Sequence, residues 1–256
     1  MIDARAIVDP RAELAADVTV GPFSIIGAGV EIGPGSIIGP HVVIKGPTRI
    51  GAGNRVFQFA SVGEDSADTK YRGEPTRLEI GDCNVIREGV TIHRGTVQDR
   101  GLTTIGNHNL FMAYVHVGHD CVIGDHVVMV NNSAAAGHVR IDDWAVLGGY
   151  ALVHQRVRIG AHSFAAMGSA IGKDVPAYVT VTGNPAEAKG INQEGLRRRG
   201  FSADAIAAIR MAYRLVYRRG YTVDAAIQAI GELIEQHPEV ALFAQSISSS
   251  RRGIVR

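Results

Sequence analysis

The chain has 256 residues, of which 46% are hydrophobic, and a net charge of +1, a composition typical of a folded protein rather than a disordered chain. The near-neutral charge argues against a nucleic-acid-binding protein, and no apolar run is long enough for insertion into a membrane. Two cysteines give no disulfide framework and the N-terminus carries no secretory signal, so we expect a cytoplasmic protein.

A repeat of six residues runs through most of the chain. An apolar residue recurs at every sixth position from Val8 to Val62, again from Ile80 to Ile92, and again from Ile105 to Ile171. Neither a helix nor a simple strand has this period. The period is typical of a solenoid in which three repeats, each one strand and one turn, close a triangular coil of about 18 residues. We therefore expect about eight coils of parallel strands around an apolar interior.

The repeat also predicts where the corners and loops lie. Glycine often follows the repeat position, as at Gly21, Gly27 and Gly33, which suits a corner that needs a small residue or a positive φ. The apolar register pauses twice, and we expect loop insertions there, at about residues 64–77 and 93–103.

Helical signals replace the repeat toward the C-terminus. Ser202 precedes apolar residues at helical spacing and is placed to cap a helix over about 203–218. Thr222 is placed in the same way before a second helix over about 223–236. Pro238 is a suitable first residue for a third helix.

These signals divide the chain into two predicted domains, a repeat solenoid at residues 1–185 and an α-helical domain at residues 186–256. The second domain has an excess of positive charge, with Arg210, Arg214 and Arg218 along one stripe of a helix. Such a stripe is either a solvated helix surface or a docking surface for an acidic partner or a phosphate group.

Stacking of the coils gathers unusual side chains on one strip. Positions about 18 residues apart lie above one another in such a solenoid. The strip contains four histidines with polar and small neighbours: His116, His119, Asp120, Gly137, His138, His154, Gln155 and Arg156. Packing explains a single histidine, but it does not explain four on one strip.

The strip suits general base catalysis. A neutral imidazole, here His119, removes a proton from a hydroxyl near neutral pH, and the carboxylate of Asp120 fixes its tautomer. Gly137 lies one coil above His119, where its N–H is able to donate to a developing oxyanion. A zinc site of three histidines is the alternative, although no clear three-histidine arrangement follows from the spacing, and we assign no metal. Cys121 has the phase of an interior residue, so direct transfer is favoured over a covalent intermediate.

Several segments resemble sequences of a known family. They are Val117-Gly118-His119-Asp120-Cys121, Ala136-Gly137-His138-Val139, Val153-His154-Gln155 and Arg252-Gly253-Ile254-Val255-Arg256. Through them the chain is similar to the bacterial UDP-N-acetylglucosamine O-acyltransferases, over essentially its whole length. The resemblance implies a mainly β fold, a left-handed parallel β-helix of hexapeptide repeats followed by a C-terminal α-helical domain.

The resemblance also implies an activity. Members of this family catalyse the first step of lipid A biosynthesis, moving a 3-hydroxyacyl group from acyl carrier protein to the 3-hydroxyl of UDP-N-acetylglucosamine. They are homotrimers with active sites in clefts between subunits, and they need no cofactor. The acidic carrier protein is a suitable partner for the arginine stripe of the C-terminal domain, together with Arg156 and Arg158.

Residue roles follow from the same resemblance. It implies that His119 is the general base, Asp120 its partner and Gly137 the oxyanion donor. It implies a second set of residues that bind the substrates: Asp68, Lys70, His116, His138, His154, Gln155, Asn192, Glu194, Arg198 and Arg199.

Met167 aligns with the part of the acyl groove that measures chain length, where some members have glycine. A methionine there fills space for terminal methylenes, each worth about 0.8 kcal/mol when buried, so we expect a shorter chain of about C10–C12. The open alternatives are another hexapeptide-repeat acyltransferase, with a different acceptor or a coenzyme A donor, and a non-catalytic scaffold.

Overall fold

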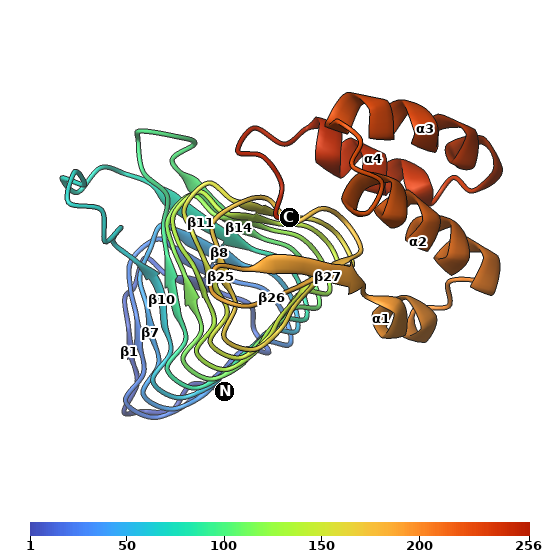
Figure 1. The fold of residues 1–256 in the computed structure, drawn as a ribbon. Helices are drawn as coiled ribbons and strands as arrows, with labels where there is room; N and C mark the ends of the chain where they lie inside the picture. The colour runs from blue at the N-terminus through green and yellow to red at the C-terminus, as the bar shows by residue number, and fades with distance from the viewer.

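The computed structural model describes residues 1–256, apart from the side chain of Val223, and most of the chain forms a triangular prism of short strands (Figure 1). Successive strands pass from one side of the prism to the next, which gives sheets of nine, eight and ten strands. We call them the first, second and third sheet. The first corner joins the first sheet to the second, the second corner joins the second to the third, and the third corner completes the coil.

The nine-stranded first sheet consists of β1 (Ile7–Val8), β4 (Ile25–Ile26), β7 (Val43–Ile44), β10 (Ser61–Glu64), β13 (Thr91–His93), β16 (His116–Val117), β19 (Ala134–Ala135), β22 (Leu152–Val153) and β25 (Ala170–Ile171). The second consists of β2 (Glu13–Leu14), β5 (Val30–Ile32), β8 (Thr48–Ile50), β11 (Arg77–Ile80), β14 (Leu102–Ile105), β17 (Val122–Ile123), β20 (Arg140–Ile141) and β23 (Arg158–Ile159). The third consists of β3 (Thr19–Val20), β6 (Ile37–Ile38), β9 (Arg55–Val56), β12 (Val85–Ile86), β15 (Leu110–Phe111), β18 (Val128–Met129), β21 (Val146–Leu147), β24 (Phe164–Ala165), β26 (Val179–Thr182) and β27 (Glu187–Ile191).

The repeat residues fill the prism, as predicted. Every one from Val20 to Ile171 is buried, and only Val8 and Leu14, at the open N-terminal end, are partly exposed. These coil strands thus turn at least one apolar side chain inward, and longer strands such as β5 turn two, Val30 and Ile32. The strands pair in parallel with partners one coil away, such as Ile7 with Ile25. Three repeats of six residues, one for each sheet, give the regular coil its 18 residues.

The glycines after the repeat position are explained by close packing of the coils and not by a positive φ. A Cβ on Gly33 would lie 2.6 Å from the carbonyl carbon of Gly51 in the next coil, so a small residue is needed where the coils approach. Positive φ occurs two residues later in the turn, and there side chains are tolerated, as at Phe23 and His41. The prediction of a small residue was therefore right and that of a positive φ at these glycines was wrong.

Both loop insertions leave the prism at the first corner (Figure 1). Residues 65–76 connect β10 to β11, and residues 94–101 connect β13 to β14. Stacked residues are 18 apart in a regular coil, as for Ser24 and Val42, but 30 apart across the first insertion and 25 across the second. The insertions fall where the apolar register paused, and they place extra chain beside the histidine strip.

The C-terminal part closes the prism and adds helices. β27 pairs antiparallel with β26, and α1 (Gln193–Arg198), α2 (Ala203–Tyr217), α3 (Val223–Gln236) and α4 (Val240–Ser248) follow. The predicted helices after Ser202 and Thr222 are confirmed, each capped by that side chain. The third begins at Val240, two residues after Pro238, while β27 and α1 were not predicted. None of the described helices combines the length and apolar character needed to cross a membrane.

Candidate active site

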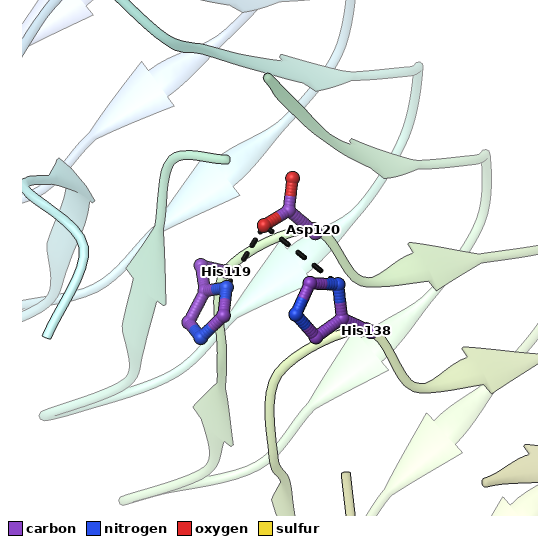
Figure 2. Close-up of side chains that lie close together, drawn as sticks. All are labelled: His119, Asp120 and His138. Carbon is purple, nitrogen blue, oxygen red and sulfur yellow. Dashed lines mark hydrogen bonds and ion pairs between the residues drawn. The ribbon is translucent and has the colours of Figure 1, made fainter. Parts of the chain in front are cut away.

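The predicted base lies at the first corner, beside its predicted partner. His119 and Asp120 form the turn between β16 and β17, where Asp120 has a φ of 58°. His119 Nδ1 lies 2.8 Å from Asp120 Oδ2 (Figure 2). The Asp120 side chain is fully buried, whereas 16% of the His119 side chain is exposed. The histidine is therefore open to a ligand while the carboxylate behind it is shielded from water.

The second insertion holds this carboxylate in place. The Thr96 backbone N–H lies 3.0 Å from both oxygens of Asp120, and the Thr96 hydroxyl donates to Oδ2 at 2.6 Å. The Asp120 N–H in turn donates to Thr103 Oγ1 at 2.8 Å. Burial opposes the charge on Asp120, but hydrogen bonds from His119 and Thr96 outweigh it and lower the pKa of the carboxyl. An ionised Asp120 accepts a hydrogen bond from Nδ1–H of His119, and this tautomer leaves Nε2 as the basic nitrogen.

Gly137 lies directly above His119, as the stacking predicted. A Cβ at this position would lie 2.5 Å from His119 Nε2, so any residue other than glycine would displace the imidazole ring. The Gly137 N–H donates to no described residue. A basic nitrogen and an unused backbone donor thus lie together at one exposed corner.

His138 completes this cluster. Its Nδ1 lies 2.6 Å from Asp99 Oδ2 and 3.9 Å from Asp120 Oδ2, and its ring centroid is 4.8 Å from that of His119. Arg156, one coil above, approaches the other ring nitrogen at 3.3 Å. The predicted juxtaposition of His119, Asp120, His138 and Arg156 is confirmed, whereas the contact with Asp99 was not predicted.

The outer histidines of the strip extend the same surface. His116 faces outward from β16, and its Nδ1 lies 2.8 Å from the hydroxyl of Thr91. Burial, then the neighbouring His93 and His119, lower the pKa of His116, which favours a neutral ring. His154 directly follows β22, two coils above β16, with Nδ1 3.1 Å from the Gln155 carbonyl oxygen.

The remaining predicted substrate residues lie elsewhere on the chain. Asp68 and Lys70 are in the first insertion, where the Lys70 N–H donates to Asp68 Oδ1 at 2.8 Å. Asn192 and Glu194 lie at the start of α1, and Arg198 and Arg199 lie at its end. All four line a cavity of about 720 Å³ with residues of the second corner, among them Trp144.

Arg199 is fixed in that cavity by its contacts with Trp144. Its guanidinium lies 5.2 Å from the centre of the indole ring, and Nη2 donates to the Trp144 carbonyl oxygen at 2.8 Å. Burial, followed by the charge of Arg199, lowers the pKa of the neighbouring His162 to about 4, so that ring is neutral near pH 7.

One chain therefore presents the predicted site in separate pieces. His119 and its neighbours are at the first corner, the α1 cavity is at the second, and Met167 is 77% exposed at the third. Sequence reasoning missed Thr96, Thr103 and Asp99, which support the first group. Their signal was weak because they lie in or beside an insertion that has no periodicity.

The same geometry bears on metal binding. Ligand atoms of His119, Asp120 and His138 lie within 4.8 Å of one another, and no other such cluster occurs among the described side chains. This set of two imidazoles and a carboxylate differs from the three-histidine site considered from the sequence.

Comparison with known proteins identifies the family of the chain. A family model described as UDP N-acetylglucosamine O-acyltransferase, domain 2, matches residues 174–255, and one described as bacterial transferase hexapeptide matches residues 11–46 and 102–137. Proteins named acyl-[acyl-carrier-protein]–UDP-N-acetylglucosamine O-acyltransferase are similar over the whole chain and 99% of their own length. That of Stutzerimonas stutzeri is 66% identical and that of Pseudomonas aeruginosa PAO1 is 69% identical.

Solved structures agree as well. LpxA from Acinetobacter baumannii has a TM-score of 0.98 at 50% identity, covering 100% of this chain and 99% of that one. A UDP-N-acetylglucosamine acyltransferase from Francisella novicida has a TM-score of 0.97 at 42% identity, covering 100% and 94%. The predicted left-handed parallel β-helix with a C-terminal helical region is confirmed.

Proposed function

Because this chain belongs to the UDP-N-acetylglucosamine O-acyltransferase family and is an acyltransferase, we propose that it acylates the 3-hydroxyl of UDP-N-acetylglucosamine. The donor is a 3-hydroxyacyl chain on acyl carrier protein, and the product enters lipid A biosynthesis. The observation that carries this proposal is the pair of His119 and Asp120 beside the unused N–H of Gly137.

The proposed reaction is a direct transfer. His119 Nε2 removes the proton of the sugar hydroxyl as its oxygen attacks the thioester carbonyl carbon, and Asp120 stabilises the imidazolium. The Gly137 N–H donates to the oxyanion of the tetrahedral intermediate. When the carbon–sulfur bond breaks, the leaving sulfur takes the proton back from Nε2. The histidine thus returns to its starting state.

A cysteine nucleophile is not supported. Cys121 follows the dyad in sequence but is fully buried inside the prism. Burial raises the pKa of its thiol to about 12, so it is protonated at neutral pH. This favours direct transfer over an acyl-cysteine intermediate.

We propose that the active enzyme is a homotrimer whose subunits share each site. The separation of the His119 group from the α1 cavity supports this, since one substrate has to contact both groups. Apolar side chains exposed on the outer face of the first sheet and at the third corner provide an unpartnered surface for the contact. They are Ile7, Ile25 and Leu152 on the sheet, and Phe23, Phe59, Tyr114 and Tyr150 at the corner.

This chain has a cationic surface beside His119 that suits the acidic carrier protein. A cavity of about 600 Å³ adjoins His138 and is lined by five arginines, Arg140, Arg156, Arg158, Arg251 and Arg252. Arg158 is partly neutralised by Asp142 at 2.8 Å. Arg210 and Arg214 of α2 line another cavity farther along the chain. We propose that these arginines attract the acidic carrier.

Met167 supports a preference for a short acyl chain, of about C10–C12, because a thioether at the end of a groove occupies the space of terminal methylenes. Its exposure at the third corner leaves it free to line a groove formed with a neighbouring subunit.

The test is acyl transfer to UDP-N-acetylglucosamine from carrier protein charged with 3-hydroxydecanoyl, 3-hydroxydodecanoyl or 3-hydroxytetradecanoyl chains. We expect transfer of the shorter chains and a loss of about a hundredfold in His119→Ala. Transfer of the tetradecanoyl chain alone would contradict the role of Met167. No transfer by the wild type with any chain would favour the alternative, an acyltransferase with another acceptor or a coenzyme A donor.

A further inference from the structure

The dyad and His138 together form a set of ligand atoms around a small space. A ring nitrogen of His119, a carboxylate oxygen of Asp120 and a ring nitrogen of His138 all lie within 4.8 Å of one another. Both rings turn Nδ1 toward the same oxygen of Asp120, at 2.8 Å from His119 and 3.9 Å from His138 (Figure 2). The Asp120 side chain is fully buried and that of His138 is only 9% exposed, so the set is already ordered.

We propose that this cluster binds one Zn²⁺ ion and that the bound ion inhibits the acyltransferase. Zinc takes imidazole nitrogens and carboxylate oxygens at about 2.0–2.2 Å, and sites with three protein ligands keep an open position. Imidazole-rich sites favour Zn²⁺, Cu²⁺ and Ni²⁺, whereas Mg²⁺ prefers oxygen ligands. Oδ2 of Asp99, 2.6 Å from His138 Nδ1, is placed to become a fourth ligand.

Inhibition follows from the tautomer that the ion selects. General base catalysis needs the hydrogen of His119 on Nδ1, where Asp120 accepts it, and a free lone pair on Nε2. An ion on Nδ1 takes the lone pair of that nitrogen, so the hydrogen of the neutral ring moves through solvent to Nε2. Nε2 lies beneath Gly137 and would then be unable to accept a proton from the substrate. Zinc binding is independent of the proposed function, whereas inhibition by this route rests on it.

Direct binding is the first test. Zn²⁺ is titrated into chelator-treated protein, without substrates, in a calorimeter. We expect about one ion per chain, and an affinity lower by about tenfold or more in His138→Gln, since an amide is a poor zinc ligand. The control is His108→Gln, which alters another pair of neighbouring histidines, His108 and His126, with ring centroids 5.0 Å apart. It should bind zinc like the wild type.

The melting temperature of each variant shows whether it folds. Asp99→Asn is a second variant, which changes the candidate fourth ligand in the second insertion. The proposal is overturned if His138→Gln binds zinc as tightly as the wild type. It is equally overturned if His108→Gln weakens binding as much as His138→Gln does, because the ion would then be bound by surface histidines in general.

Inhibition is tested with enzyme loaded beforehand with one Zn²⁺ per chain, and the zinc that stays on the enzyme is measured in the assay mixture, because the diphosphate of UDP-N-acetylglucosamine competes for the ion. The zinc concentration is far below that of UDP-N-acetylglucosamine, so zinc bound by the diphosphate removes a negligible share of the substrate. We expect activity to fall by about tenfold or more, to return with a chelator, and to be unchanged by Mg²⁺. Full activity of a zinc-loaded enzyme would refute inhibition. If chelator-treated enzyme transfers no acyl chain, the proposed function fails while the binding result stands.

Discussion

At the scale of single residues, the proposed chemistry depends on the space above His119. A methyl group on Gly137 would lie 2.5 Å from Nε2 and 2.6 Å from Cε1 of the ring, so the imidazole has to move. Moving it changes the position of the basic nitrogen relative to the substrate. We expect Gly137→Ala to lower kcat by about a hundredfold, the size of losses when oxyanion or base geometry is disturbed.

Gly172 provides the control, because it also lies in the turn after a strand of the first sheet but a Cβ there has nothing within 4 Å. Gly172→Ala should keep the activity of the wild type. Kinetics of both variants, with melting curves to show that they fold, make the comparison. An active Gly137→Ala enzyme would mean that the ring adapts without cost.

The low pKa of Asp120 has a consequence for stability against acid. The carboxyl binds a proton less readily in the folded protein than in the unfolded chain, where its pKa is near 3.8. Its charge therefore stabilises the fold above pH 3.8, and this contribution is lost as the pH falls through the lower folded value.

Asp120→Asn removes that titration but keeps a side chain of similar size. We expect the variant to be less stable than the wild type at pH 7, with the difference becoming smaller below about pH 4. Denaturant unfolding at a series of pH values measures it. A difference that stays constant across this range would show that the carboxyl does not titrate with a lowered pKa.

At the scale of elements, the coils and the positions of the insertions were predictable, but the contacts that order the insertions were not. One apolar residue in six determines which side chain of each strand faces inward, and from Val20 to Ile171 no exception occurs. The contacts that order the insertions have no period. Arg94 bonds to the carbonyl of Gly46, 48 residues away, and Thr96 bonds to Asp120, 24 residues away.

Short elements escaped prediction for a related reason. α1 has six residues, too few to show a helical period, and β27 pairs antiparallel outside the coil pattern. The stacking rule brought His119, Gly137 and His138 together correctly, but it gave no information on Asp99 or Thr96. The division of the chain near residue 185 remains a prediction.

Arg94 is the main anchor of the first insertion. Its Nη1 donates to the carbonyl oxygens of Gly46 and Gly63 at 2.7 and 2.9 Å. Its Nη2 donates to the Tyr71 hydroxyl at 3.0 Å and pairs with the carboxylate of Asp65. The side chain is 7% exposed, and its planar fork joins the prism to the start and the middle of the loop.

We expect Arg94→Lys to loosen the loop that carries the predicted substrate residues Asp68 and Lys70. One ammonium group is unable to replace the fork, so KM for UDP-N-acetylglucosamine should rise by about tenfold with kcat nearly unchanged, as for a lost binding contact of about 1.4 kcal/mol. Hydrogen exchange of residues 65–76 should accelerate.

Arg72→Lys is the control, because Arg72 bonds only within the loop. Its Nη1 donates to the carbonyl oxygens of Thr69 and Tyr71, and its backbone N–H donates to Glu74. Equal effects of both changes would contradict an anchoring role for Arg94.

At the scale of the whole molecule, the separation of the two groups of predicted site residues makes the proposed trimer testable. His119 is at the first corner, and Arg198 belongs to the α1 cavity at the second. If each site combines His119 of one chain with Arg198 of a neighbouring chain, a substitution of His119 and a substitution of Arg198 damage different halves of the site. Two inactive variants are then able to correct each other in a mixed trimer.

We therefore expect His119→Ala and Arg198→Ala to be weakly active alone and to regain activity when their chains are mixed by refolding or co-expression. Arg198 is suitable because its side chain is 77% exposed, so the change should not disturb the fold. In a random equal mixture, about a quarter of the interfaces unite an intact base with an intact Arg198. Activity of the mixture should approach about a quarter of the wild-type value. The matched control is a chain that carries both substitutions, mixed with the wild-type chain. No recovery in the mixture would show that one chain supplies both groups to its own site.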